Sequence, residues 1–200
     1  MNDTPTVSVP AHAHVTCVRT AQPADAAAAC ALLRAAITRA CAPDHGHDPA
    51  VLAGWLANKT PEHVAAWIAA AANHCIVAEA ERGGALAGIA LVTRKGRIAL
   101  LHVAPDRLRR GVGSALLAAL ERQGRAWGLA ELRVDGTRSA RDFFVQHGYR
   151  AGPPVNTTYG IVAVALVKRL VPSYARRPAC GWGGGDRDID RCDRRIPDNG

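Results

Sequence analysis

Aromatic residues and closely spaced cysteines are both scarce in this sequence. Phe, Trp and Tyr make up 4% of the 200 residues, which leaves few side chains that could stack on nucleic acid bases. None of the six cysteines belongs to a CxxC pair, and this excludes a zinc site built from such pairs and a dense disulfide framework. We therefore interpret the cysteines as reduced and mostly buried thiols.

Long hydrophobic runs and a targeting segment are lacking as well. No apolar run approaches the roughly 20 residues that a membrane span requires. Residues 1–15 have neither the basic start nor the apolar centre of a signal peptide. We expect a cytoplasmic protein with no membrane partner.

The sequence does contain an ordinary share of apolar residues and an excess of positive charge. Apolar residues make up 48% of the chain and charged residues 21%, as in soluble globular domains. The formal net charge is +8 and the pI is about 9.7. This charge favours an anionic ligand, either a nucleotide-like cofactor or nucleic acid.

The chain divides into three parts by composition. Residues 1–14 are polar and aperiodic, which predicts a flexible N-terminal tail. Residues 15–170 carry the periodic apolar patterns of one domain. Residues 171–200 combine a glycine run with alternating Asp and Arg, which predicts a disordered low-complexity tail. The charges of this tail nearly cancel, so it does not resemble a nucleic-acid-binding arm.

The periodic part predicts a mixed α/β (α+β) sheet. A short strand at 15–19 precedes helices over about 25–37, 51–56 and 61–71. Strands at 74–80, 85–93 and 97–103 then follow at hairpin spacing, so they are expected to be antiparallel. The rest predicts alternating elements: a helix over 111–127, a strand over 131–135, a helix over 138–147 and a last strand over 159–168.

Residues 100–120 carry the most informative functional pattern. A strand ends at Val103, Pro105 breaks it, and Gly111 and Gly113 lead into a helix. The first-turn amides of a helix have no partner within the helix and lie at its positive end, so they bind phosphate oxygens well. Glycines there let a phosphate come close to the backbone. Three arginines add positive charge at the rim: Arg107, Arg109 and Arg110. We predict a diphosphate site.

Two other phosphate-binding motifs fit this segment poorly. A P-loop requires GxxxxGK followed by Ser or Thr, which is absent. A dinucleotide fingerprint requires a third glycine where Leu116 stands and a tight turn directly after the strand. A capped helix preceded by a glycine-containing turn is the alternative that involves no ligand.

The segment resembles the acetyl-CoA-binding motif of the GNAT superfamily of N-acetyltransferases. The residues that match it are Val103, Pro105, Gly111, Val112 and Gly113. A second family feature, an alanine, an aromatic pair and a glycine followed by an aromatic residue, is matched by Ala140, Phe143, Phe144, Gly148 and Tyr149. Both features occur in the family's order, and the resemblance covers about residues 15–168.

The resemblance implies a fold, a ligand and a reaction. It implies antiparallel strands 2–4, then a parallel pair of strands 4 and 5 that splay around acetyl-CoA, with helices on both faces. The acceptor amine would attack the thioester directly, and the N–H of Val103 would stabilise the resulting oxyanion. The coenzyme contacts that it implies are Leu101, Val103, Leu108, Arg109, Arg110, Gly111, Val112, Gly113, Ser114, Ser139 and Phe144.

Two positions depart from the family pattern. Leu108 stands where the family has Arg or Gln, so a neighbouring arginine has to compensate at the diphosphate. Phe144 stands where the family often has the Tyr that protonates the departing thiolate. Ser139 or Tyr149 could donate that proton, or the thiolate could leave unaided because thiols have a pKa near ~8.5 to 9.

The attacking amine also has to lose a proton, and His102 is the first candidate base. It is expected to share a strand face with Ile98 and Leu100, and imidazole titrates near ~6.5. The alternative is a half-buried strand histidine with no role in proton transfer. Glu79 is the second candidate, better explained as a solvated or structural carboxylate, and water could replace either group.

Two further groups of residues receive structural interpretations. The four histidines at positions 12, 14, 45 and 47 lie in predicted loops without cysteine partners, so we interpret them as surface residues and expect no metal. Trp55 and Trp67 are expected on helix faces, as core residues or as walls of an acceptor pocket.

The sequence thus predicts an acetyl-CoA-dependent N-acetyltransferase, either a monomer or a homodimer. The alternative is a non-catalytic acyl-CoA-binding module, motivated by Phe144 and Leu108, and a nucleic-acid-binding protein ranks last. The acceptor stays open among small amines, polyamines, antibiotics, peptide N-termini and lysine side chains, because acceptor pockets come from variable helices and loops.

Overall fold

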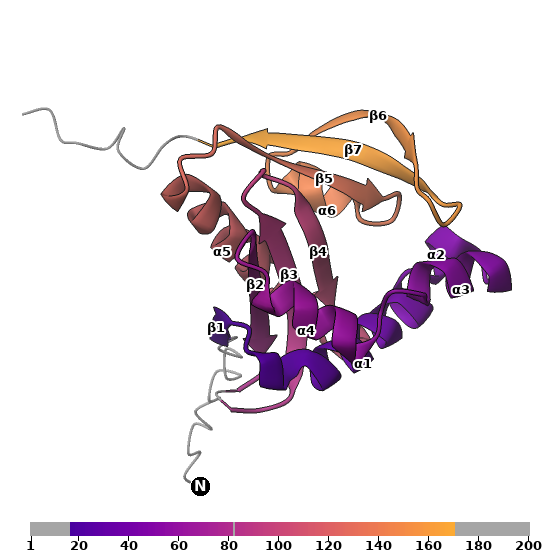
Figure 1. Ribbon diagram of the computed structural model, residues 1–200. Coiled ribbons are helices and arrows are strands. Elements are labelled where there is room, and N and C mark those ends of the chain that lie inside the picture. The colour runs from indigo at the N-terminus through magenta and orange to yellow at the C-terminus, as the bar shows by residue number, and fades with distance from the viewer. Residues whose placement is uncertain (1–16, 82, 171–200) are drawn as a thin grey trace, which may run out of the picture.

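The computed structural model describes residues 17–81 and 83–170 (Figure 1). The tails predicted for residues 1–14 and 171–200 lie outside these residues. The elements, with α for α-helices, β for strands and η for short 3₁₀ or π segments, follow in this order: β1 (Cys17–Thr20), η1 (Pro23–Asp25), α1 (Ala26–Ala35), η2 (Ala36–Ala40), α2 (Ala42–His45), α3 (Pro49–Leu56), α4 (Pro61–Ala69), β2 (Asn73–Glu79), β3 (Leu86–Thr93), β4 (Ile98–Val103), η3 (Pro105–Arg107), α5 (Val112–Ala126), β5 (Glu131–Thr137), α6 (Arg141–Gln146), β6 (Arg150–Asn156) and β7 (Val162–Arg169).

The strands form two antiparallel sheets that touch at one point. The first has the order β1-β2-β3-β4 and the second the order β5-β7-β6. Within the described residues the sheets are joined by one parallel bridge, between Arg97 and Arg133, where the Arg133 N–H donates to the Gly96 carbonyl at 2.8 Å. Beyond this bridge β4 and β5 form no ladder, and Figure 1 shows the second sheet crossing over the end of the first. The predicted mixed α/β fold with a splayed β4/β5 pair is confirmed.

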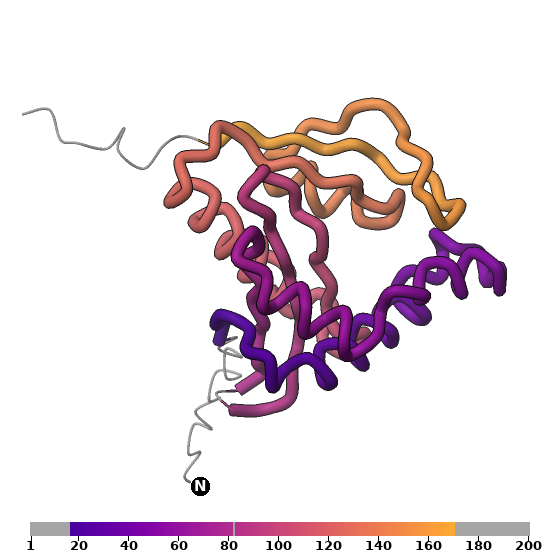
Figure 2. The backbone as a smooth tube through the Cα atoms, in the orientation of Figure 1, coloured from indigo at the N-terminus to yellow at the C-terminus, as the bar shows by residue number. Residues whose placement is uncertain are grey.

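Helices cover both faces of the first sheet (Figure 2). Successive residues of a strand point to opposite faces, so the buried strand β3 serves two cores. Ala90 and Val92 pack with Leu116 and Leu120 of α5, whereas Ile89 and Leu91 belong to the core formed by α1 and α4. The long apolar run at 85–93 is therefore explained by burial on both sides.

The structure adds a strand that the sequence did not predict and shortens another. β6 (Arg150–Asn156) contains Pro153 and Pro154, and its pairing with β7 shifts register between Ala151 and Pro154. Proline is tolerated at a sheet edge or a bulge, and β6 lies at such an edge. In the sequence, however, the two prolines argued against a strand. The last strand begins at Val162 instead of Tyr159 because residues 157–161 form the turn that joins β6 to β7.

The described cysteines agree only in part with the expectation of buried thiols. Cys30 and Cys75 are buried, whereas Cys17 and Cys41 keep some exposure, and all four are free thiols. Burial raises the pKa of the Cys41 and Cys75 thiols to about 12, so both are unreactive at neutral pH. No helix in residues 17–81 and 83–170 is long and apolar enough to cross a membrane.

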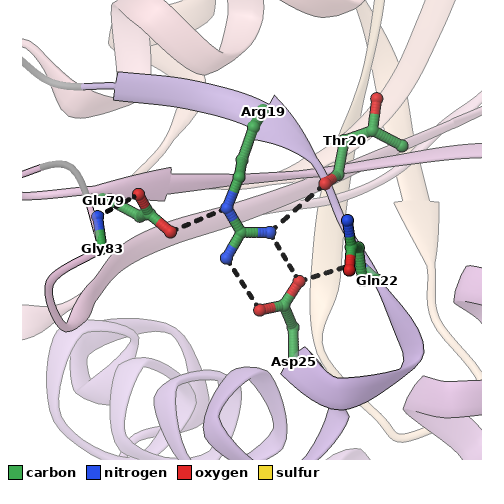
Figure 3. A network of polar contacts seen from close by, with 6 residues as sticks. All are labelled: Arg19, Thr20, Gln22, Asp25, Glu79 and Gly83. Atoms are coloured by element: carbon green, nitrogen blue, oxygen red, sulfur yellow. Dashed lines mark hydrogen bonds and ion pairs between the residues drawn. The ribbon is translucent and has the colours of Figure 1, made fainter.

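One arginine ties the first strand to the turn between β2 and β3 (Figure 3). The Arg19 guanidinium donates to both carboxylate oxygens of Asp25, at 2.7 and 2.8 Å, and to Glu79 at 2.7 Å. Glu79 also accepts the Gly83 N–H at 2.9 Å, and Asp25 accepts the Gln22 N–H at 2.7 Å. These hydrogen bonds lower the pKa of both carboxyls. The largest contribution comes from Arg19 at Asp25 and from the Gly83 N–H at Glu79. Glu79 is thus a structural carboxylate.

We expect Arg19→Leu to lower the melting temperature by at least about 5 °C at pH 7, because it leaves two nearly buried carboxylates without their cation. Since both carboxyls have lowered pKa values, their contribution is present above the ordinary carboxyl pKa of about 4 and is lost as the pH falls. The difference from the wild type should therefore shrink at pH 3, measured by circular dichroism. Arg133→Leu, which breaks an exposed pair with Glu131, is the matched control and should have little effect. An equal loss at both pH values would mean that Arg19 acts only through packing.

Candidate functional site

The loop between β4 and α5 presents a run of unpaired backbone amides. None of the N–H groups of residues 108–114 donates a hydrogen bond to another group of the described chain. Gly111 occupies the N-cap position of α5 and supplies no capping side chain. Arg109 and Gly111 both have positive φ, 60° and 81°, and such left-handed residues turn successive amides toward one side. The result is a concave group of donors at the positive end of a 15-residue helix.

The charges around this loop favour an anion. Arg109 and Arg110 are exposed and form no ion pair with any described residue, whereas Arg107 pairs with Asp106 at 3.4 Å. Leu108 is 46% exposed on the loop surface and contributes its backbone amide alone. Two free guanidinium groups therefore lie in the same loop as the free amides, so Arg109 and Arg110 are available for the compensation predicted at Leu108.

The two glycines of the loop are required for different reasons. A Cβ at Gly111 would meet no atom within 4 Å, so glycine is favoured there by its positive φ. A Cβ at Gly113 would lie 3.3 Å from the Phe143 ring and 3.7 Å from a methyl group of Val103. Gly113 thus lets the first turn of α5 pack against α6 and the end of β4, a role beyond the ligand access expected from the sequence.

The end of β4 offers backbone groups to the space between the two sheets. Val103 pairs with Gly88 of β3, and the next residue, Ala104, donates to the Ala87 carbonyl at 2.9 Å. Hydrogen bonding alternates along an antiparallel strand, so the N–H groups of Val103 and Leu101 point away from β3, to the side where β5 diverges. The side chain of Val103 lies on the α5 face.

His102 lies on the face of β4 opposite to Val103, and the residues that share this face differ from those predicted. A register shift places Ala99 in a bulge, so that Leu91 pairs with Leu100 and Val92 with Ile98. Ile98 therefore packs with α5 and Leu100 with α1 and α4. The prediction that His102 shares a face with both residues is wrong for Ile98, because the extra residue reverses the alternation.

The surroundings of His102 keep its imidazole neutral. Although the residue retains some accessible surface, the protein packed around the ring lowers its pKa to about 4, with a further contribution from the positive charge of Lys59. The Lys59 ammonium is itself nearly buried, bonded to the Trp55 carbonyl at 3.3 Å, and burial lowers its pKa. At neutral pH His102 thus has a free lone pair for a proton, although it is a weak base.

Two of the predicted coenzyme contacts have other partners. The amide of Ser139 donates to Asp44 of α2 at 3.0 Å, and its hydroxyl bonds the same carboxylate. Phe144 is buried in the core, with its ring 5.3 Å from that of Tyr149. The structure thus brings together Val103, residues 108–114 and Phe143, whereas Glu79 lies in the Arg19 network.

Sequence reasoning missed a second histidine beside the loop. His147, in the last turn of α6, lies 2.9 Å from the hydroxyl of Ser114 in α5. Nothing in the spacing of the sequence indicated this contact, because it joins two helices that are separated by β5.

The loop histidines also differ from expectation. His45 is buried, so its interpretation as a surface residue is wrong: α2 ends there and turns the ring inward, where Nδ1 accepts the His47 N–H at 3.1 Å. His47 is exposed as expected, and His12 and His14 lie outside the described residues. Within residues 17–81 and 83–170, no three His, Cys, Asp or Glu side chains group as a metal site would require.

Comparisons with known proteins bear on the whole domain. Residues 29–170, well over half of the chain, match the family described as Acetyltransferase (GNAT) domain. No curated protein matches the chain. Among solved structures, a GCN5-related N-acetyltransferase from Rhodopseudomonas palustris is 28% identical with a TM-score of 0.68, over 78% of this chain and 96% of that one.

Two other solved structures share the fold and contain the coenzyme. The PaiA N-acetyltransferase from Thermoplasma acidophilum, in complex with coenzyme A, is 14% identical with a TM-score of 0.62, over 77% of this chain and 98% of that one. YncA from Salmonella typhimurium, with its cofactor acetyl-CoA, is 20% identical with a TM-score of 0.60, over 82% of this chain and 99% of that one.

Proposed function

Because the chain belongs to the GNAT family of acetyltransferases, we propose that it transfers the acetyl group of acetyl-CoA to a primary amine by direct attack within a ternary complex. One observation carries this proposal: the free amides of residues 108–114, at the start of α5, are hydrogen-bond donors at the positive end of a helix, which suits the negative oxygens of a diphosphate. The splay of β4 and β5 supplies the second requirement, a strand edge to which the rest of the coenzyme can bind.

The coenzyme would lie along β4 and end at the loop. Its extended amide-containing arm can add to the free edge of β4 through the backbone groups of Leu101 and Val103. Its diphosphate would accept hydrogen bonds from the amides of the loop and of the first turn of α5, and from the free arginines. The residues concerned are Leu108, Arg109, Arg110, Gly111, Val112, Gly113 and Ser114. Ser139 could join them only by giving up Asp44, and Phe144 only through the buried core, so we leave both out of the contact set.

The reaction needs little from side chains. The Val103 N–H, directed into the space beside β4, would stabilise the oxyanion that forms when the amine attacks the thioester carbonyl. His102 can accept a proton from the amine because it is neutral at physiological pH, and water is the alternative acceptor. Phe144 has no proton to give, so coenzyme A would depart as a thiolate, which its low thiol pKa permits. Positioning of two substrates accounts for most of the rate.

The direct test measures the release of free thiol from acetyl-CoA in the presence of small amines, polyamines, lysine peptides and peptides with free N-termini. We expect amine-dependent thiol release and an acetylated product by mass spectrometry for at least one class. Tight binding of acetyl-CoA without turnover on any amine would support the non-catalytic acyl-CoA-binding module. A folded protein that binds neither coenzyme A nor acetyl-CoA in calorimetry would refute both functions.

We expect Gly111→Ala to weaken coenzyme A binding about tenfold, because the free loop of the variant can relax out of the left-handed conformation and binding must restore it, at a cost of about 1–2 kcal/mol. Gly128→Ala is a matched control, since Gly128 lies just beyond the other end of α5 with a φ of 70° and open space around it. Gly128→Ala should lose thermal stability without a change in affinity, whereas Gly111→Ala should lose affinity in calorimetry. Equal affinities would show that the loop does not bind the coenzyme.

We expect His102→Gln to lower kcat about 100-fold, the lower range for loss of a general base. Since burial and Lys59 lower the pKa of His102 to about 4, the wild-type kcat should show no His102-dependent decrease as the pH falls from 8 to 5. The exposed His63 provides the control variant His63→Gln, which should behave as the wild type. An unchanged kcat in His102→Gln would assign the proton to water instead.

A further inference from the structure

A chain of hydrogen bonds runs from the first turn of α5 into α6. Nδ1 of His147 lies 2.7 Å from the Phe143 carbonyl, and Nε2 lies 2.9 Å from the Ser114 hydroxyl. A carbonyl only accepts, so Nδ1 carries the proton of a neutral ring and Nε2 must accept from Ser114. In this state the only hydroxyl proton of Ser114 is directed toward His147.

Ser114 stands at the centre of the proposed diphosphate site. It is the third residue of α5, and its amide is one of the donors without a partner. The imidazole of His147 is fixed beside it, since its ring centre lies 4.4 Å from that of Phe143, which in turn packs against Gly113. With a neutral His147, Ser114 presents lone pairs instead of a proton to an approaching phosphate, and this opposes binding.

Arg109 and Arg110 of the loop are free, whereas several other charged groups around His147 are paired. On α5, Glu121 pairs with Lys168 of β7 at 2.8 Å and with Arg125 at 3.3 Å. The Lys168 ammonium also donates to the His147 carbonyl at 2.7 Å. On α6, Arg141 pairs with its neighbour Asp142 at 2.8 Å. No free carboxylate therefore faces the imidazole from the described elements around it.

We propose that binding of the coenzyme diphosphate is coupled to the uptake of one proton by His147. The proton comes from solvent and adds to Nε2, which then donates to the Ser114 oxygen, and the hydroxyl proton of Ser114 turns to a phosphate oxygen. No covalent bond between heavy atoms changes. His147 is thus a positioning residue that acts through Ser114, and the inference rests on the proposed function of the loop. Because binding takes up a proton, affinity should fall as the pH rises from 5.5 to 8.

The test uses dephospho-coenzyme A, because the 3′-phosphate of coenzyme A titrates near ~6 itself and would confuse the profile. We expect the wild type to bind this ligand about tenfold more weakly at pH 8 than at pH 5.5. Calorimetry at pH 7 in two buffers of different ionisation enthalpy should show net proton uptake. His147→Gln and Ser114→Ala should abolish both effects, and Ser114→Thr, which keeps the hydroxyl, should retain them. His63→Gln, which removes an exposed histidine on α4, should match the wild type.

Each contrary outcome has a distinct meaning. Wild-type binding that does not depend on pH, or an unchanged profile in Ser114→Ala, overturns the coupling and leaves the proposed function intact. A wild type that binds at no pH overturns the coenzyme site itself. Thermal unfolding of each variant checks the fold, and Ser114→Ala, which removes one hydroxyl, carries the test if His147→Gln does not fold.

Discussion

Backbone N–H groups without internal partners are the constraint on which the rest of this structure depends. Most backbone donors of a folded chain are paired, so a run of free amides at the start of a long helix needs a conformation that holds it open. Arg109 and Gly111 provide this conformation through left-handed backbone angles, and left-handed angles are uncommon in arginine. Within the described residues, the amides of this loop have no acceptor.

The separation of the two sheets leaves backbone N–H groups without partners in β4 as well. A continuous sheet would pair both edges of this strand, and the Val103 amide would then be satisfied by β5. Among the described residues, backbone pairing between the sheets is limited to the bridge at Arg97 and Arg133, near the start of both strands. Past that point one edge of β4 is free, so the strand that leads into the loop also keeps unpaired backbone groups, as the proposed coenzyme site requires. Residues 104–107 separate the two sets of donors along the chain, and the amides of Ala104 and Arg107 in this segment are paired.

Side chains then divide the surroundings of β4 into two environments. Val103 lies on the face covered by α5, close to the loop and to α6, whereas His102 lies on the face covered by α1 and α4, near the buried Lys59. The two residues proposed to act on the thioester and on the amine therefore lie on different faces of one strand. The paired contact of Asp44 with Ser139 joins α2 to the β5–α6 connection, so the helices on the acceptor side are tied to the second sheet.

The sequence by itself determined most of the helices and strands and the position of the glycine-containing loop. The phosphate loop, the helix after it and the three central strands follow from local signals: glycine and proline positions, first-turn amides and period-two burial. β6 was not predicted, because its prolines are compatible with a strand only at an edge, and the sequence does not show where the edges of the sheets are. Tertiary structure alone decided the rest. One bulged residue, Ala99, set the face on which His102 lies, burial set its pKa, and helix packing brought His147 to Ser114. These properties depend on contacts between residues far apart in the chain, and periodicity along the chain carries no information about them.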